Sequence, residues 1–109
     1  MTEERRESER VRAALPARWE GVLAGSDGSV ADLSQTGCFV VTGAEVRPHE
    51  LIRLEIETES GRRLYLWGEV VYRIDEIGFA LRFTDTGRAE QQTLASLIAS
   101  VRGRDAKKE

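Results

Sequence analysis

The segment Leu51-Ile52-Arg53-Leu54-Glu55-Ile56-Glu57 alternates between apolar and charged residues along its whole length. The three residues Ile52, Leu54 and Ile56 fall on one face, and the charged residues fall on the other. A period of two is typical of a β-strand with one buried face and one wet face. This segment therefore predicts a strand, and the chain around it can be searched for the strands that pair with it.

Five further strand-like runs surround this segment, and turn residues separate them. They cover Ala17–Leu23, Val30–Leu33, Cys38–Thr42, Leu64–Arg73 and Gly78–Phe83. The pair Asp27-Gly28 between two apolar runs predicts a hairpin turn, because both residues tolerate positive φ. Gly68 inside a long run predicts a bulge or bend of the kind that lets a sheet curl into a barrel.

Only the C-terminal part has a helical period. Apolar residues recur there at i, i+3, i+4 and i+7, namely Leu94, Leu97, Ile98 and Val101. They form one stripe of a helix that starts near residues 86–88 and ends at Gly103. We expect this stripe either to cap the barrel or to form the seam of a dimer, so the monomer and the homodimer both stay open.

The chain of 109 residues fits one small domain. Residues 1–12 form a charged arm, residues 13–101 form the barrel with its helix, and residues 102–109 form a polar tail. The arm has almost no apolar side chains, so it cannot offset its ordering entropy, and we expect it to be flexible. The predicted fold class is an all-β-dominated, six-stranded antiparallel β-barrel with a C-terminal α-helix and a flexible N-terminal arm.

Composition excludes several function classes. The net charge of −3 argues against a nucleic-acid binder, and the chain has no apolar run of eighteen residues that could insert into a membrane. The single cysteine, Cys38, cannot form an internal disulfide, and we expect it to be a small buried hydrophobic residue. The lone His49, next to a proline, reads as a solvated loop residue. We therefore expect a cytoplasmic non-enzyme without metal or cofactor. The rings of Trp19, Trp67 and Tyr72 could stack on a base, but with so few aromatic residues in the chain we expect them to pack in the core.

Two short patterns carry functional information. The first is Arg6-x-x-x-Arg10, preceded by Arg5, and the second is Asp32-x-Ser34-x-x-Gly37. Chance alone supplies about 1.7 arginine pairs at this spacing but only about 0.03 copies of the second pattern. Arginine presents a planar fork of donors that matches phosphate oxygens and guanine O6 and N7, while aspartate accepts from guanine N–H groups. Together the patterns predict a clamp for a guanine nucleotide.

Read with the strand pattern, the sequence resembles a PilZ domain, the bacterial receptor module for cyclic di-GMP. The family motif is Arg-x-x-x-Arg, followed some twenty to thirty residues later by Asp or Asn-x-Ser-x-x-Gly, and this chain matches both halves. Further similarity lies in Leu15–Arg18, Gly68–Val71 and Gly78–Phe83, so the resemblance covers about residues 5 to 100. It implies a six-stranded antiparallel β-barrel with a C-terminal helix, in agreement with the prediction above.

The resemblance also implies roles for individual residues. Arg6 and Arg10 are expected to grip guanine edges and phosphate, Asp32 and Ser34 to pair with a guanine edge, and Gly37 to permit the turn. An arginine at the position of Arg5 resembles family members that bind two mutually intercalated cyclic di-GMP molecules.

The implied function is a stand-alone cyclic di-GMP effector. Its surface and its arm would change on binding and signal to a protein partner in motility, pilus or exopolysaccharide control. The alternative is a PilZ-like adaptor that binds a protein and no nucleotide. Each motif also has an interpretation that involves no ligand. The arginines would then belong to a solvated charged arm, and Asp32–Ser34 would form a turn that stabilises only itself.

Overall fold

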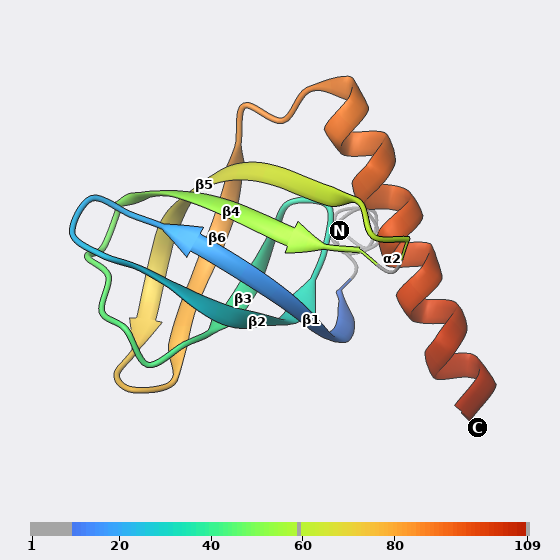
Figure 1. The fold of residues 1–109 in the computed structure, drawn as a ribbon, viewed down its shortest axis with the longest axis horizontal. Coiled ribbons are helices and arrows are strands. Elements are labelled where there is room, and N and C mark those ends of the chain that lie inside the picture. The colour runs from blue at the N-terminus through green and yellow to red at the C-terminus, as the bar shows by residue number, and fades with distance from the viewer. Residues whose placement is uncertain (1–9, 59, 109) are drawn as a thin grey trace, which may run out of the picture.

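The computed structural model describes residues 10–58 and 60–108, without the side chains of residues 104–108. Six antiparallel strands form a closed barrel in the order β1-β2-β3-β6-β5-β4, and one helix follows them (Figure 1). The predicted six-stranded antiparallel β-barrel with a C-terminal helix is confirmed, whereas residues 1–9 of the predicted arm lie outside the described residues. The elements are β1 (Val11–Glu20), β2 (Gly25–Leu33), β3 (Gly37–Val41), β4 (Leu51–Glu57), β5 (Arg63–Ile74), β6 (Gly78–Thr84) and α2 (Arg88–Lys108).

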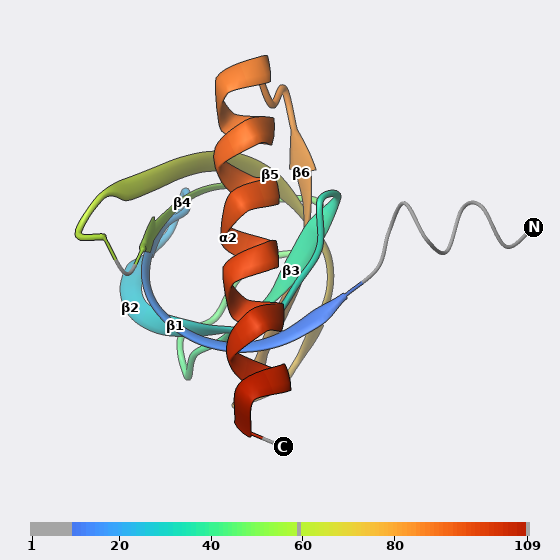
Figure 2. The same cartoon turned by 90° about the vertical axis from the view of Figure 1, so that its right-hand side faces the viewer.

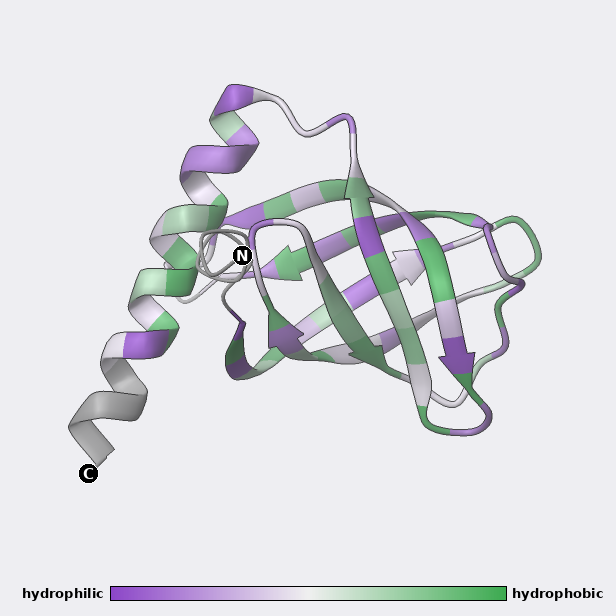
Figure 3. Cartoon of the chain, turned by 180° about the vertical axis from the view of Figure 1, so that it is seen from behind, coloured by the Kyte–Doolittle hydropathy of each residue, from purple (hydrophilic) through white to green (hydrophobic). Residues whose placement is uncertain are grey.

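The core fills the inside of the barrel, as the alternating pattern predicted. Ile52, Leu54 and Ile56 of β4 are all fully buried. Trp19 of β1 is buried as well and packs edge-on against Phe79 of β6, with ring centroids 5.3 Å apart. Figure 3 shows the resulting alternation of hydrophobic and hydrophilic residues along the strands. Removal of this apolar surface from water is the main stabilising term for such a barrel.

Helix α2 crosses one mouth of the barrel (Figure 2). Its predicted stripe, Leu94, Leu97, Ile98 and Val101, is buried, and the helix contacts β1 and β5. The stripe therefore caps the barrel of its own chain. The prediction that the helix ends at Gly103 is wrong, since α2 continues to Lys108. Gly103 is exposed, and the alanine and lysines that follow it are good helix formers, so the expected polar tail is helical instead.

The first hairpin differs from the prediction. The turn lies at Gly21–Ala24, where the Gly21 amide donates to the Ala24 carbonyl at 2.7 Å. Asp27 and Gly28 lie inside β2, opposite β1, so the Asp-Gly turn prediction is wrong. Here the glycine allows close packing, because a Cβ at Gly28 would come within 2.8 Å of the Val41 carbonyl oxygen of β3.

Strand β1 is also displaced relative to its prediction. It starts at Val11, inside the segment expected to be an arm, and ends at Glu20. Val11 is buried and pairs with Leu33, whereas Val22 and Leu23 are exposed in the turn that follows the strand. The sequence analysis assigned Val11 to the arm because the residues on both sides of it are charged. They lie on the outer face, where water solvates them.

Candidate ligand-binding site

A cavity of about 240 Å³ opens where the β2–β3 turn meets β5 and β6. We call it the β2–β3 cavity. Four of the predicted site residues line it: Arg10, Asp32, Ser34 and Gly37. Its other lining residues are Leu33, Thr36, Cys38, Phe39, Val71, Tyr72, Ala80, Leu81 and Arg82. Arg5 and Arg6 lie outside the described residues. The fold thus brings Arg10 of the first motif to the same place as the second motif, because Arg10 immediately precedes β1 and β1 pairs with β2.

Ser34 builds the turn beside this cavity. Its side chain is buried, and its Oγ accepts from the amides of Thr36 and Gly37, both at 3.2 Å. The same Oγ lies 3.2 Å from Thr36 Oγ1 and 3.3 Å from the Gly37 carbonyl oxygen. The Thr36 carbonyl in turn accepts from the Phe83 amide at 2.8 Å, which ties the turn to β6. Ser34 therefore fixes the shape of the cavity rim, as Ser-type turns do.

A bulge in β2 decides which way Asp32 points. The register of β2 against β3 shifts between Val30 and Asp32, which leaves Ala31 as an extra residue. Without that shift Asp32 would share the inner face with Val30, since side chains alternate along a strand. With the shift, Leu33 is buried and Asp32 lines the β2–β3 cavity. Re-aiming a side chain at a site is a common role of bulges.

Gly37 is required for a different reason from the one predicted. It is the first residue of β3 and pairs with Arg82 of β6. The described backbone does not hold it at positive φ, so the turn itself does not demand glycine. A Cβ at this position would lie 2.2 Å from the Leu81 carbonyl oxygen. Glycine is needed because β6 passes so close.

Arg10 and Asp32 are the two charged motif residues in the described chain, and both remain available. Arg10 is exposed and Asp32 is partly buried. Neither side chain makes a hydrogen bond or ion pair with another residue of segments 10–58 and 60–108. A cation and a carboxylate thus face one cavity, and neither has a partner among the described residues. They can donate to a phosphate or a base acceptor and accept from base N–H groups.

Two aromatic residues also line the cavity, and the sequence analysis assigned neither of them to the site. Phe39 of β3 and Tyr72 of β5 have ring centroids 6.4 Å apart. Ala80 of β6 pairs with both residues, so a small side chain lies between two rings. Tyr72 is 51% exposed, which corrects the expectation that it packs in the core. The expectation fails for Trp67 as well, which is 50% exposed on the outer face of β5.

Tyr72 reaches the outer face through a second bulge. The register of β5 against β6 shifts between Val70 and Tyr72, so Val70 is buried while Val71 and Tyr72 both face outward. Gly68, where a bulge was predicted, keeps regular pairing with Ile52 and Phe83. The bulge lies three residues further along, at Val71, because an extra residue and not a glycine creates it.

Two single residues behave as the sequence predicted. Cys38 is buried, and burial raises the pKa of its thiol. An apolar surrounding disfavours the thiolate, so this cysteine is unsuited to nucleophilic chemistry. His49 lies in the loop before β4, and its side chain is 80% exposed. In the described segments, no group of three or more metal-ligating side chains gathers, and no helix is long and apolar enough to cross a membrane.

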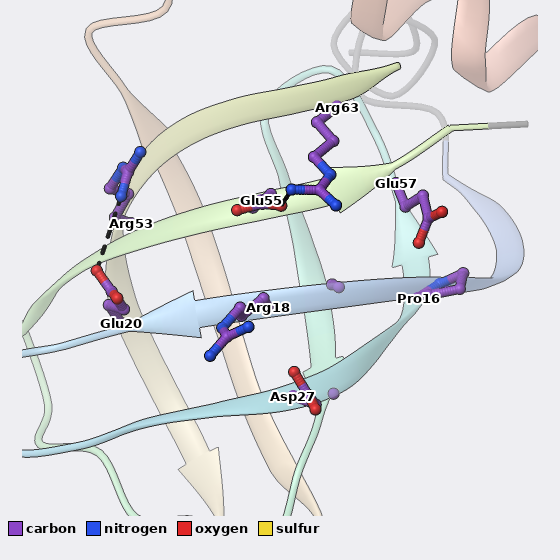
Figure 4. Close-up of a pocket in the computed structure, with 10 residues that line it drawn as sticks. Pro16, Arg18, Glu20, Asp27, Arg53, Glu55, Glu57 and Arg63 are labelled. Atoms are coloured by element: carbon purple, nitrogen blue, oxygen red, sulfur yellow. Dashed lines mark ion pairs between the residues drawn. The ribbon is translucent and has the colours of Figure 1, made fainter. Parts of the chain in front are cut away.

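A larger hollow of about 560 Å³ lies on the outer face of β1, β2 and β4 (Figure 4). We call it the charged groove. It is lined by Pro16, Ala17, Arg18, Glu20, Asp27, Gly28, Arg53, Glu55, Glu57 and Arg63. Arg53 pairs with Glu20 at 3.7 Å, and Arg63 pairs with Glu55 at 3.1 Å. Three arginines and four carboxylates line the groove, so charges of both signs are mixed there and no large charge of one sign is concentrated.

Comparison with known proteins assigns the fold to a family. The PilZ domain family model matches residues 4–100. The solved PilZ domain of YcgR from Escherichia coli with c-di-GMP is 14% identical, with a TM-score of 0.80, and the match covers 95% of this chain and 96% of that one. The PilZ domain of CeSA from a cellulose-synthesizing bacterium is 17% identical, with a TM-score of 0.70 and coverage of 87% and 99%.

A third neighbour is the Bacillus subtilis inhibitor of motility, MotI/DgrA, which is 21% identical with a TM-score of 0.73. The match covers 96% of this chain and 53% of that protein. No curated protein matches this chain. At these identities the solved structures show a shared fold.

Proposed function

The chain belongs to the PilZ domain family, and on this premise we propose that it is a receptor that binds cyclic di-GMP in the β2–β3 cavity. The observation that carries the proposal is the convergence of Arg10, Asp32, Ser34 and Gly37 on that one cavity. The first and last of these residues are far apart in the sequence, and the fold brings them together. The neighbouring PilZ domain of YcgR was solved with c-di-GMP, which supports the same ligand here.

Each wall of the cavity has a counterpart in the ligand. The Asp32 carboxylate is matched to the N1–H and N2–H₂ donors of a guanine edge, and Arg10 is matched to guanine acceptors or phosphate. The rings of Phe39 and Tyr72 flank Ala80 and offer a stacking surface for a base. Ser34 supports these contacts by holding the turn.

The size of the cavity suggests how the remaining motif arginines contribute. A volume of about 240 Å³ is below the roughly 300–1,000 Å³ typical of small-molecule pockets. The described residues would therefore hold one part of the ligand, and Arg5 and Arg6 would hold the rest. We propose two intercalated nucleotides per chain on the basis of Arg5. The signal then passes to a protein partner through the altered surface, as befits a cytoplasmic receptor and not an enzyme.

Calorimetric titration of the purified chain with cyclic di-GMP tests the proposal, with GTP and cyclic AMP as ligand controls. We expect micromolar or tighter binding that is specific to cyclic di-GMP. A molar ratio near two would support the role of Arg5, and a ratio of one would refute it. No binding by a folded chain would refute the receptor function and favour the adaptor function.

A pair of matched variants links the binding to the cavity. Asp32→Asn keeps the shape of the side chain but replaces one acceptor oxygen with a donor, so it should weaken binding by about 1–3 kcal/mol. Asp27→Asn makes the same change in the charged groove, also on β2. It should leave the affinity unchanged. Equal losses in both variants would contradict the assignment of the site.

A further inference from the structure

Glu69 of β5 lies outside the β2–β3 cavity and forms an ion pair with Arg82, a cationic residue that lines it. Its Oε1 accepts from Arg82 Nη2 at 2.7 Å, and its Oε2 lies 3.1 Å from His49 Nδ1. The pairing of β5 with β6 places Glu69 directly opposite Arg82. Arg82 lines the cavity, whereas Glu69 does not. One carboxylate therefore retains a guanidinium at the edge of the site.

We propose that Arg82 is a further ligand-contacting residue and that Glu69 is the counter-ion with which a ligand phosphate competes for it. This inference rests on the proposed function. Arg82 uses Nη2 for Glu69, and the hydrogen-bond contacts of the described residues leave its Nε and Nη1 without an acceptor. Its side chain is 63% exposed, so it has room to turn toward the cavity.

The energetics favour an exchange of partners. An exposed arginine–carboxylate pair in water contributes little, because solvent screens it and both side chains lose rotamer freedom. A phosphate held among the other cavity residues offers arginine two oxygens in a planar, bidentate arrangement. His49 remains beside the second oxygen of Glu69, so the carboxylate keeps a neighbour when Arg82 leaves. Loss of Glu69 should therefore make Arg82 more available to the ligand.

The barrel supplies a matched control pair outside the cavity. Arg63 and Glu55 are 3.1 Å apart, with side chains 60% and 24% exposed. For Arg82 and Glu69 the corresponding values are 2.7 Å, 63% and 28%. Both pairs join neighbouring strands on the outer face, and the control pair lines the charged groove. The same substitutions there change the net charge equally without touching the proposed site.

The experiment is a double-mutant cycle on affinity for cyclic di-GMP. Titrations compare the wild type, Arg82→Gln, Glu69→Gln and the double variant, with Arg63→Gln and Glu55→Gln as controls. We expect Arg82→Gln to weaken binding about 10-fold or more and Glu69→Gln to tighten it about 2- to 5-fold. In the Arg82→Gln background the gain from Glu69→Gln should vanish. The controls should stay within about 2-fold of the wild type.

Each other outcome is decisive. Wild-type affinity in a folded Arg82→Gln variant would overturn the inference while leaving the proposed function intact. Weaker binding by Glu69→Gln would overturn it too, because Glu69 would then orient Arg82 for the ligand. A gain from Glu69→Gln that persists without Arg82 would reduce the effect to net charge. Failure of the wild type to bind would remove the proposed function and this inference together.

Discussion

The β2–β3 cavity and the charged groove both bring arginines and carboxylates together on the outer face of the barrel, yet their charges differ in what they can do. In the groove, Arg53 and Arg63 already pair with glutamates. In the cavity, Arg10 and Asp32 have no partner in the described part of the chain. The groove is more than twice as large, at about 560 against 240 Å³. The groove also contains Arg18, Asp27 and Glu57, which make no side-chain hydrogen bond or ion pair within the described residues. What distinguishes the cavity is that its unpaired charges, Arg10 and Asp32, are the motif residues and lie beside the rings of Phe39 and Tyr72.

The largest expected effect is on the free energy of unfolding, when a glycine that lines either the cavity or the groove is replaced by alanine. Gly37→Ala should lower the free energy of unfolding by about 3 kcal/mol, because the new Cβ would lie 2.2 Å from the Leu81 carbonyl oxygen. Gly28→Ala, in the groove, meets the Val41 carbonyl oxygen at 2.8 Å and should cost about 1 kcal/mol. Urea unfolding measures both values.

Gly43→Ala is the control for these two variants, since nothing lies within 4 Å of its added Cβ. It should leave the free energy of unfolding unchanged. If Gly37→Ala is as stable as Gly43→Ala, the close approach of β6 does not explain this glycine. The motif glycine would then have to act on the ligand directly.

The next effect concerns affinity. Arg10→Ala should weaken cyclic di-GMP binding by about 1–3 kcal/mol through loss of a bidentate contact. Its effect on stability should be small, because Arg10 is exposed and makes no contact that holds the barrel. Calorimetry and thermal melting measure the two quantities. Arg18→Ala makes the same truncation in the groove and should change neither. A variant Arg10→Ala that melts early but binds normally would show a structural arginine.

Parts of the fold could be predicted from the sequence, and other parts could not. The alternation in Leu51–Glu57 and the stripe from Leu94 to Val101 predicted their elements, because one side of each must be buried. The prediction of a turn at Asp27-Gly28 was wrong. Glycine is needed at residue 28 because the Val41 carbonyl oxygen of β3 lies close to it, and β3 is not adjacent in the sequence. Local propensity cannot register such a contact.

The sequence predicted only part of the site, again because some of its residues meet through contacts between strands that are distant in the sequence. The motif spacing identified Arg10 and Asp32, but Tyr72 and Arg82 join them only through the register of β3, β6 and β5. One signal was present in the sequence. Alternation from Val30 would bury the charge of Asp32, so a bulge at Ala31 was needed to avoid an unpaired buried carboxylate. Sequence alternation also places Trp67 outside, between the buried Leu66 and Val70 of β5.

A smaller effect depends on pH and concerns the inner wall of the cavity. Burial raises the pKa of the Cys38 thiol above its ordinary value near 8.5. The folded state therefore keeps the proton at a pH where the unfolded chain has lost it. The stability contribution is complete below the unfolded pKa and declines as pH rises above it. Between pH 8 and 10 the wild type should lose about 1–2 kcal/mol more than Cys38→Ala.

Urea unfolding of both proteins at the two pH values measures this difference. All other titrating groups contribute equally to the two chains, so the comparison isolates the thiol. Rapid modification of native Cys38 by a thiol reagent at pH 8 would argue against its burial. An equal pH dependence of the two proteins would do the same.

The smallest effect lies in the charged groove. Glu20→Gln removes the partner of Arg53, but the pair is 3.7 Å long and both side chains are about half exposed or more. Such pairs contribute about 0–1 kcal/mol, so we expect a loss within about 0.5 kcal/mol that disappears at high salt. Urea unfolding at low and high ionic strength measures it. Arg53 also lies over the Tyr65 ring, 5.1 Å from its centroid, and keeps that contact in the variant. A loss well above 1 kcal/mol would mean that the paired charges of the groove form a structural network. The groove would then differ from the β2–β3 cavity because its charged pairs stabilise the barrel, whereas the motif residues Arg10 and Asp32 have no such partners in the described part of the chain.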